Sequence, residues 1–223
     1  MRHIILALLV AMALPTTVRA QESARDRAQR VLPAEVFQSL AALAEEGASS
    51  GIPTEPLFSK ALEGLAKRVP ASRLMPAIQS YASRLGQARS AFGPTAGSPL
   101  LVAGADALQR GVARDALERL GGHEARSPMA VLVLADLIDT GISAERAIEI
   151  LREAMSARTG DDRMLDLPVQ IRRLMREGRN VREAADQVRD GLRRSRGGQD
   201  VGPPVPPGSE PRTRTRGTRG GNP

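Results

Sequence analysis

The segment SPMAVLVLADLIDTGISAE, residues 127–145, decides the fold of this 223-residue chain. It opens with a serine that can cap a helix and with a proline, which suits the first helical turn because its missing N–H would be unpaired there. From Pro128 to Asp139 it is apolar on nearly every side, a pattern typical of a helix in the middle of a core. Gly141 can take the left-handed conformation that ends a helix, and a second helix is expected directly after it. The segment therefore predicts a helical hairpin.

The same pattern occurs elsewhere in the chain. Residues 98–120 repeat the order of serine, proline, apolar helix, glycine and second helix, and a looser copy runs from Leu167 to a last helix at 181–192. One hairpin cannot bury its apolar face alone, so several must stack. The glycines expected at the turns are spaced irregularly, which argues against a strict solenoid: Gly51, Gly111, Gly141 and Gly178.

These observations predict an all-α fold, either an irregular bundle or a short array of stacked helical hairpins, with about nine helices. Composition agrees, because aromatic residues make up only 2% of the chain and the abundant alanine, leucine, arginine and glutamate favour helix over strand. The earlier helices are expected at 33–46, where Gly47 ends the first, then from Thr54 to about Val69, and at 72–89.

The hairpins are similar in style to those of helical-hairpin repeat proteins. They lack the tryptophan, tyrosine and glycine pattern of the tetratricopeptide consensus. The resemblance therefore implies a type of architecture and carries over no residue role.

The N-terminal residues 1–20 have the parts of a secretory signal peptide. Arg2 gives a positive start, the apolar run from Ile4 is about 11 residues long, and Val18 and Ala20 are small enough for a cleavage site. The run is too short for the ~20 residues of a membrane-spanning helix. We therefore expect an exported protein, periplasmic or extracellular, that begins near Gln21 and has no membrane span in its mature chain.

The absence of cysteine excludes disulfide scaffolds, thiolate zinc sites and cysteine nucleophiles. The formal net charge is +7, but basic and acidic side chains are equal in number over residues 21–192. A balanced core has no field typical of a nucleic-acid binder, so no specific nucleic-acid partner is expected.

The excess positive charge lies at the ends, above all in residues 193–223. This tail is rich in proline, glycine and arginine, and we expect it to be disordered because it cannot bury enough apolar surface to fold. Its exposed guanidinium groups are candidates for contact with an anionic polymer or with lipid headgroups: Arg212, Arg214, Arg216 and Arg219.

Catalytic and metal-binding patterns are weak. His123 is the one histidine outside the predicted signal peptide and reads as a surface loop residue, and the cluster of Asp161, Asp162 and Asp166 does not follow the ligand order of a calcium loop. Asp106 and Asp136 occupy matching places in two hairpins, so a carboxylate-based hydrolase would need them to share a cleft. No catalytic, cofactor or metal residue is therefore assigned.

The sequence predicts three parts: a signal peptide at 1–20, an all-helical domain at 21–192 and a disordered tail at 193–223. The expected function is that of an exported, non-enzymatic helical scaffold or binding module of the bacterial cell envelope, with another envelope protein as partner. Two alternatives stay open, which are attachment to anionic surfaces through the tail and a carboxylate-based hydrolase.

Overall fold

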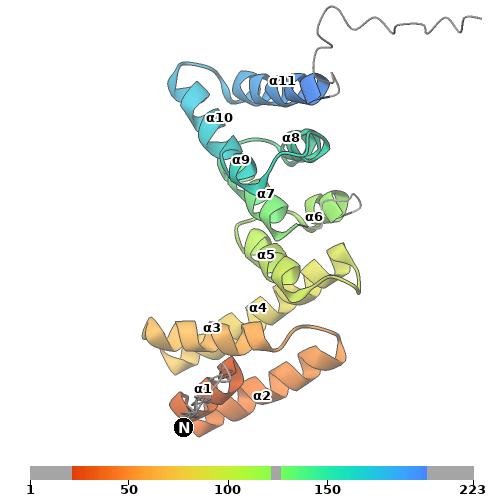
Figure 1. Ribbon diagram of the computed structural model, residues 1–223. Helices are drawn as coiled ribbons and strands as arrows, with labels where there is room; N and C mark the ends of the chain where they lie inside the picture. The colour runs from red at the N-terminus through yellow and green to blue at the C-terminus, as the bar shows by residue number, and fades with distance from the viewer. Residues whose placement is uncertain (1–21, 122–126, 200–223) are drawn as a thin grey trace, which may run out of the picture. The chain divides into compact units, whose positions relative to one another are not determined.

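The computed structural model describes residues 22–121 and 127–199, and every regular element in these ranges is an α-helix (Figure 1). The predicted all-α fold is therefore confirmed for this part of the chain. The signal peptide predicted at 1–20 and the part of the tail at 200–223 lie outside the described residues. The chain forms two compact units, of which one ends at Ala82 and the other begins at Ser83.

The first unit contains α1 (Ala24–Val31), α2 (Ala34–Ser49), α3 (Glu55–Ala66) and the first part of α4 (Ala71–Phe92). Helices α1, α2 and α3 pack against one another. Their core is apolar, and its largest fully buried side chains are Phe58, Leu40, Leu57 and Ile78. Ser23 caps α1, because its Oγ accepts a hydrogen bond from the backbone N–H of Asp26 at 3.1 Å.

The predicted end of α2 is wrong. Gly47 does not stop the helix, which continues to Ser49. Gly47 is buried inside it, where an added Cβ would lie 3.5 Å from the Cβ of Ile52. The turn is made instead at Gly51, whose φ is +70°. The distance of 3.5 Å to Ile52 is an ordinary van der Waals contact, so the packing around position 47 does not require glycine.

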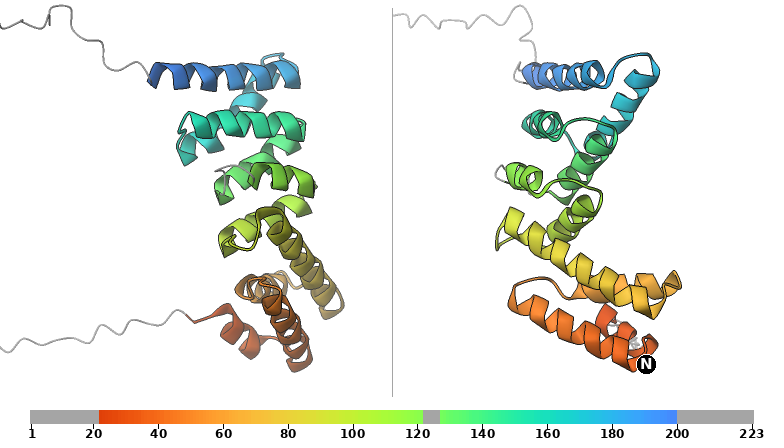
Figure 2. Two further views of the ribbon diagram at one scale, coloured as in Figure 1. Left: turned by 90° about the vertical axis from the view of Figure 1, so that its right-hand side faces the viewer. Right: turned by 180° about the vertical axis from the view of Figure 1, so that it is seen from behind.

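The second unit contains the rest of α4 and seven further helices: α5 (Ser98–Gln109), α6 (Arg114–Gly121), α7 (Pro128–Asp139), α8 (Ala144–Ser156), α9 (Asp161–Leu165), α10 (Leu167–Arg176) and α11 (Val181–Gln199). They form two layers (Figures 1 and 2): α5, α7 and α10 follow one another in one layer, and α6, α8 and α11 in the other. The hairpins α5–α6, α7–α8 and α10–α11 are thus stacked, as the repeated pattern predicts.

Helix α7 is the centre of this unit and has the bounds that the sequence predicts. It packs against α5, α8, α9 and α10. Val133, Leu134 and Leu137 are completely buried, whereas Leu132 is 37% exposed, so one side of the helix does reach solvent. Within the described ranges, the buried side chains of both units include none that is polar or charged.

The helix ends agree with the sequence in part. Ser127 caps α7, with its Oγ 3.2 Å from the backbone nitrogen of Met129. The matching Ser98 does not cap α5, because the N-cap residue is Gly97 and the helix already includes Ser98. Helices α1 and α9 were not expected.

The last helix passes the boundary predicted at residue 192. Helix α11 continues to Gln199, and its Arg193 makes an ion pair with Glu153 of α8, with 2.9 Å between Nε and Oε1. This pairing gives the first residues of the predicted tail a folded neighbour. No described helix is both long and apolar enough to cross a membrane.

Candidate functional site

The two aspartates of the hydrolase hypothesis lie on adjacent helices but have different surroundings. Asp136 of α7 accepts a hydrogen bond from Nη2 of Arg110 at 2.5 Å, and Nε of the same arginine donates to Asp139 at 2.9 Å. The pKa of Arg110 is raised, first by the hydrogen bond to Asp139 and then by that to Asp136. Arg110 follows α5 directly, so this cluster ties the end of α5 to the end of α7.

Asp106 takes no part in that cluster. Its side chain has no hydrogen bond or ion pair to any residue that the structure describes. A hydrolase needs one carboxyl as an acid and a second as base or nucleophile, both facing the substrate. Here the carboxylate of Asp136 is already hydrogen-bonded to the guanidinium group of Arg110, which competes with such a role.

The remaining sequence candidates contribute no assembled site. His123 and the arginines Arg212, Arg214, Arg216 and Arg219 lie outside the described residues. Asp161 and Asp162 occupy the first turn of α9, where carboxylates complement the helix dipole, and Asp166 follows its last turn. In the part of the chain that the structure describes, no group of three or more His, Cys, Asp or Glu side chains is arranged to hold a metal ion.

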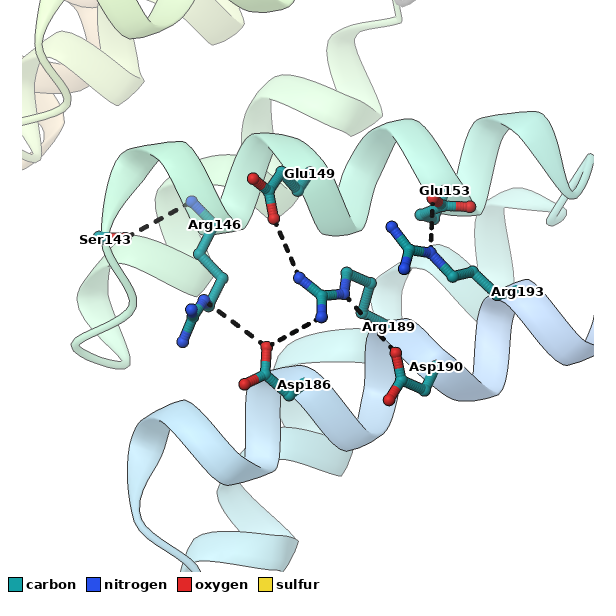
Figure 3. Close-up of polar contacts among 8 residues, drawn as sticks. All are labelled: Ser143, Arg146, Glu149, Glu153, Asp186, Arg189, Asp190 and Arg193. Atoms are coloured by element: carbon teal, nitrogen blue, oxygen red, sulfur yellow. Dashed lines mark hydrogen bonds and ion pairs between the residues drawn. The ribbon is translucent and has the colours of Figure 1, made fainter.

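A row of ion pairs joins α8 to α11 (Figure 3). Nη1 of Arg189 lies 3.1 Å from Oε2 of Glu149, and Nη2 lies 3.3 Å from Oδ1 of Asp186. At one end of the row, Nε of Arg146 lies 3.8 Å from the same oxygen of Asp186. At the other end, Arg193 pairs with Glu153, as described above. The row spans the interface along both helices and holds the last helix in place.

A cleft lined mainly by positively charged side chains lies nearby, at the same end of the stack. It has a volume of about 680 Å³ and is bounded by the end of α8 and by α9, α10 and α11. Four arginines line it, against a single carboxylate, that of Asp166: Arg158, Arg163, Arg173 and Arg194. Nε of Arg173 bonds Glu177 at 3.0 Å, whereas the other three have no carboxylate partner among the described residues. The cleft therefore carries uncompensated positive charge.

The sequence did not predict this cleft, and the anion-binding candidates that it did predict lie outside the described residues. Comparison with known proteins gives no match to a family model, to a curated protein or to a solved structure. The class that can be assigned is thus structural: an all-helical protein whose second unit is a stack of hairpins.

Proposed function

We propose that the protein is an exported, non-enzymatic helical scaffold or binding module of the bacterial cell envelope. The observation that carries this proposal is the two-layered stack of hairpins α5–α6, α7–α8 and α10–α11, because such stacks present extended surfaces of parallel helices to a partner. The charged groups at Arg110 and Arg189 join neighbouring helices, which suits a rigid platform. Export is supported by the sequence of residues 1–20 alone.

The scaffold role is tested by cross-linking in the producing cell. A photo-cross-linking residue is placed at exposed positions of the two layers, at Glu145 on α8 and at Val169 on α10. If the protein is a scaffold, the cross-linking residue in one of the two layers should capture the same envelope protein in repeated experiments. The cross-linked protein should be the processed form that begins near Gln21. Retention of the unprocessed chain in the cytoplasm would contradict the proposal.

The hydrolase alternative is separated by a combined variant of Asp106→Asn and Asp136→Asn. A scaffold keeps its cross-linked partner in this variant, provided that circular dichroism shows an intact fold. Loss of the cellular function with both the fold and the cross-link preserved would favour chemistry at these carboxylates and count against a non-enzymatic role.

Attachment to anionic surfaces through the tail is the second candidate. It is favoured by the course of α11, which leads the chain from a packed hairpin directly into the arginine-rich residues after Gln199. Binding of the full chain to anionic vesicles should fall steeply with salt. Replacing the four arginines after residue 199 by glutamine should abolish this binding, whereas replacing them by lysine should preserve most of it: Arg212, Arg214, Arg216 and Arg219.

The substitutions are preferable to removal of residues 193–223, because that deletion would also remove part of α11 and the ion pair between Arg193 and Glu153. Unchanged vesicle binding by the glutamine variant would reject attachment through the tail.

A further inference from the structure

Arginine occupies two helix ends at a position where this chain otherwise uses glycine. Within the described ranges, seven residues have a positive φ, and five of them are glycines: Gly51, Gly93, Gly111, Gly141 and Gly178. The other two are Arg68, with φ of +56°, and Arg158, with φ of +49°. Glycine adopts this left-handed conformation without steric cost, whereas a residue with a side chain does not. An arginine retained in such a conformation is an outlier that points to a function of its side chain.

The two turns share their hydrogen bonds as well as their arginines. At Arg158, the backbone nitrogen donates to the carbonyl oxygen of Met155, and the nitrogen of Thr159 donates to that of Ala154. At Arg68, the same two bonds run to the residues three and five positions earlier. The conformation is therefore a regular helix-ending turn in both units, with arginine substituted for the usual glycine.

A second arginine follows each of these by the same interval. The sequences are RVPASR at 68–73 and RTGDDR at 158–163. In both cases the first and last arginine line one cavity, which in the first unit also includes Lys67. The same pair of positions thus builds a basic cavity twice, in two units that fold separate parts of the chain.

The cavity of the second unit gathers the larger number of arginines. Besides Arg158 and Arg163 it gathers Arg173 from α10 and Arg194 from α11 around one carboxylate, Asp166. Nearby arginines behave differently, since those at the interface of α8 and α11 are matched by carboxylates across the interface. In the cleft, by contrast, Arg158, Arg163 and Arg194 have no carboxylate partner among the described residues.

In this turn the side chains, and not the backbone N–H groups, are available to bind a ligand. The N–H groups of Ala157, Arg158 and Thr159 all donate to carbonyl oxygens of α8 and are not free for a ligand. Guanidinium groups offer paired donors in a planar fork that matches the oxygens of a phosphate group. Thr159 and Gln170 in the lining add uncharged hydrogen-bonding groups.

We propose that the cleft bounded by the end of α8 and by α9, α10 and α11 is a binding site for a phosphate-bearing anion. Several arginines and a volume of about 680 Å³ suit more than one phosphate group, such as a diphosphate. This binding activity goes beyond the scaffold role. The phosphate group can belong to a soluble molecule or to a lipid headgroup, because the recognising chemistry is the same.

The experiment is a calorimetric titration of inorganic pyrophosphate into the full chain at low salt. Arg158→Gly is the decisive variant, because glycine takes the left-handed conformation readily and the fold should be retained, with a thermal midpoint equal to or above that of the wild type. Arg158→Gly and Arg163→Gln should each weaken pyrophosphate binding by about tenfold or more. Arg182→Gln, an exposed arginine on α11 outside the cleft, is the matched control and should change binding by less than about twofold.

Wild-type affinity in the Arg158→Gly variant, or an equal loss in Arg182→Gln, would overturn the proposal. Equal affinity for citrate would overturn the assignment to phosphate. Loss of pyrophosphate binding when only the four arginines after residue 199 are replaced by glutamine would move the site out of the cleft and also overturn the proposal.

A second arm separates the two sources of phosphate. The assay is flotation with vesicles that contain phosphatidic acid, with the arginines after residue 199 left intact. If the Arg158→Gly variant floats less than the wild type, the cleft binds the phosphate of a lipid headgroup. Pyrophosphate binding that depends on Arg158, together with flotation that does not, assigns the site to a soluble phosphate compound. If neither readout depends on Arg158, the proposal fails.

Discussion

Replacing Arg189 by methionine should loosen α11 from α8. The side chain of Arg189 is only 20% exposed, and its guanidinium group lies 3.1 Å from Glu149 and 3.3 Å from Asp186. Methionine keeps an apolar stem of similar length, so the substitution removes mainly the charge and its hydrogen bond to Glu149. It also removes the cation that Glu149 of α8 and Asp186 of α11 share.

The expected loss follows from the burial of the partners. Exposed ion pairs contribute about 0–1 kcal/mol, whereas breaking a fully buried pair costs about 3–5 kcal/mol. Glu149 and Asp186 are 54% and 36% exposed, which places this cluster between the two cases. We expect a loss of about 1–2 kcal/mol. The matched control is Arg173→Met, because Arg173 and Glu177 are 72% and 52% exposed and should contribute at most about 0.5 kcal/mol.

Native-state hydrogen exchange is the suitable assay. Helix α11 packs mainly on α8 and α10 at the end of the stack, so a weakened interface should open locally before the rest of the unit unfolds. A loss of 1–2 kcal/mol corresponds to exchange of the α11 amides that is about 5–30 times faster. Unchanged exchange in α11, or an equal acceleration in Arg173→Met, would refute a structural role of the row of ion pairs.

Three further predictions concern the core and the surface. Leu134→Ala, in the completely buried face of α7, should lower the free energy of unfolding by about 2–5 kcal/mol in urea titrations, and a loss below about 1 kcal/mol would contradict the central place of α7. Gly104→Ala should lower the melting temperature despite the better helix propensity of alanine, because its Cβ would lie 2.7 Å from Cε2 of Phe92; a higher melting temperature would show that the contact is loose. The pKa of Glu63 is lowered to about 2, first by the hydrogen bond from Lys67 and then by that from Lys60. Because the folded-state pKa is depressed, this contribution to stability is complete above the ordinary value of 4.5 and is lost as the pH falls towards 2. NMR titration should show the pKa of Glu63 rising in Lys67→Gln, and an ordinary pKa in the wild type would rule out the pair.

The hairpins of the second unit could be predicted from the sequence because local signals and packing agree there. The apolar run of α7 coincides with the helix at the centre of the unit, and the glycines that follow α5, α7 and α10 all have positive φ. Helix α1 could not be predicted in the same way. Its sequence, ARDRAQRV, buries only Ala24 and Ala28, two small side chains that leave no visible apolar stripe. Its position depends on contacts with α2 and α3, which are separate segments of the sequence.

The sequence could not predict which charged side chains are paired, because these contacts also join separate segments of the chain. Repeat symmetry suggested Asp106 as the neighbour of Asp136, but stacking of α5 on α7 brings Arg110 to that carboxylate instead. The cleft collects arginines from four separate helix ends and helices, so no local motif marks it. The one local signal is Arg158, which stands where the hairpins otherwise place glycine, and it becomes recognisable only when the end of α8 is known.

The central claim is that some arginines join helices whereas others bind an anion. An NMR titration with pyrophosphate that follows the side-chain Nε–H signals of arginine tests this claim most directly. The signals of Arg158 and Arg163 should shift in a saturable manner, while those of Arg146 and Arg189 stay in place because their guanidinium groups are already paired across the interface of α8 and α11. Equal shifts at Arg189, or shifts confined to arginines after residue 199, would contradict it.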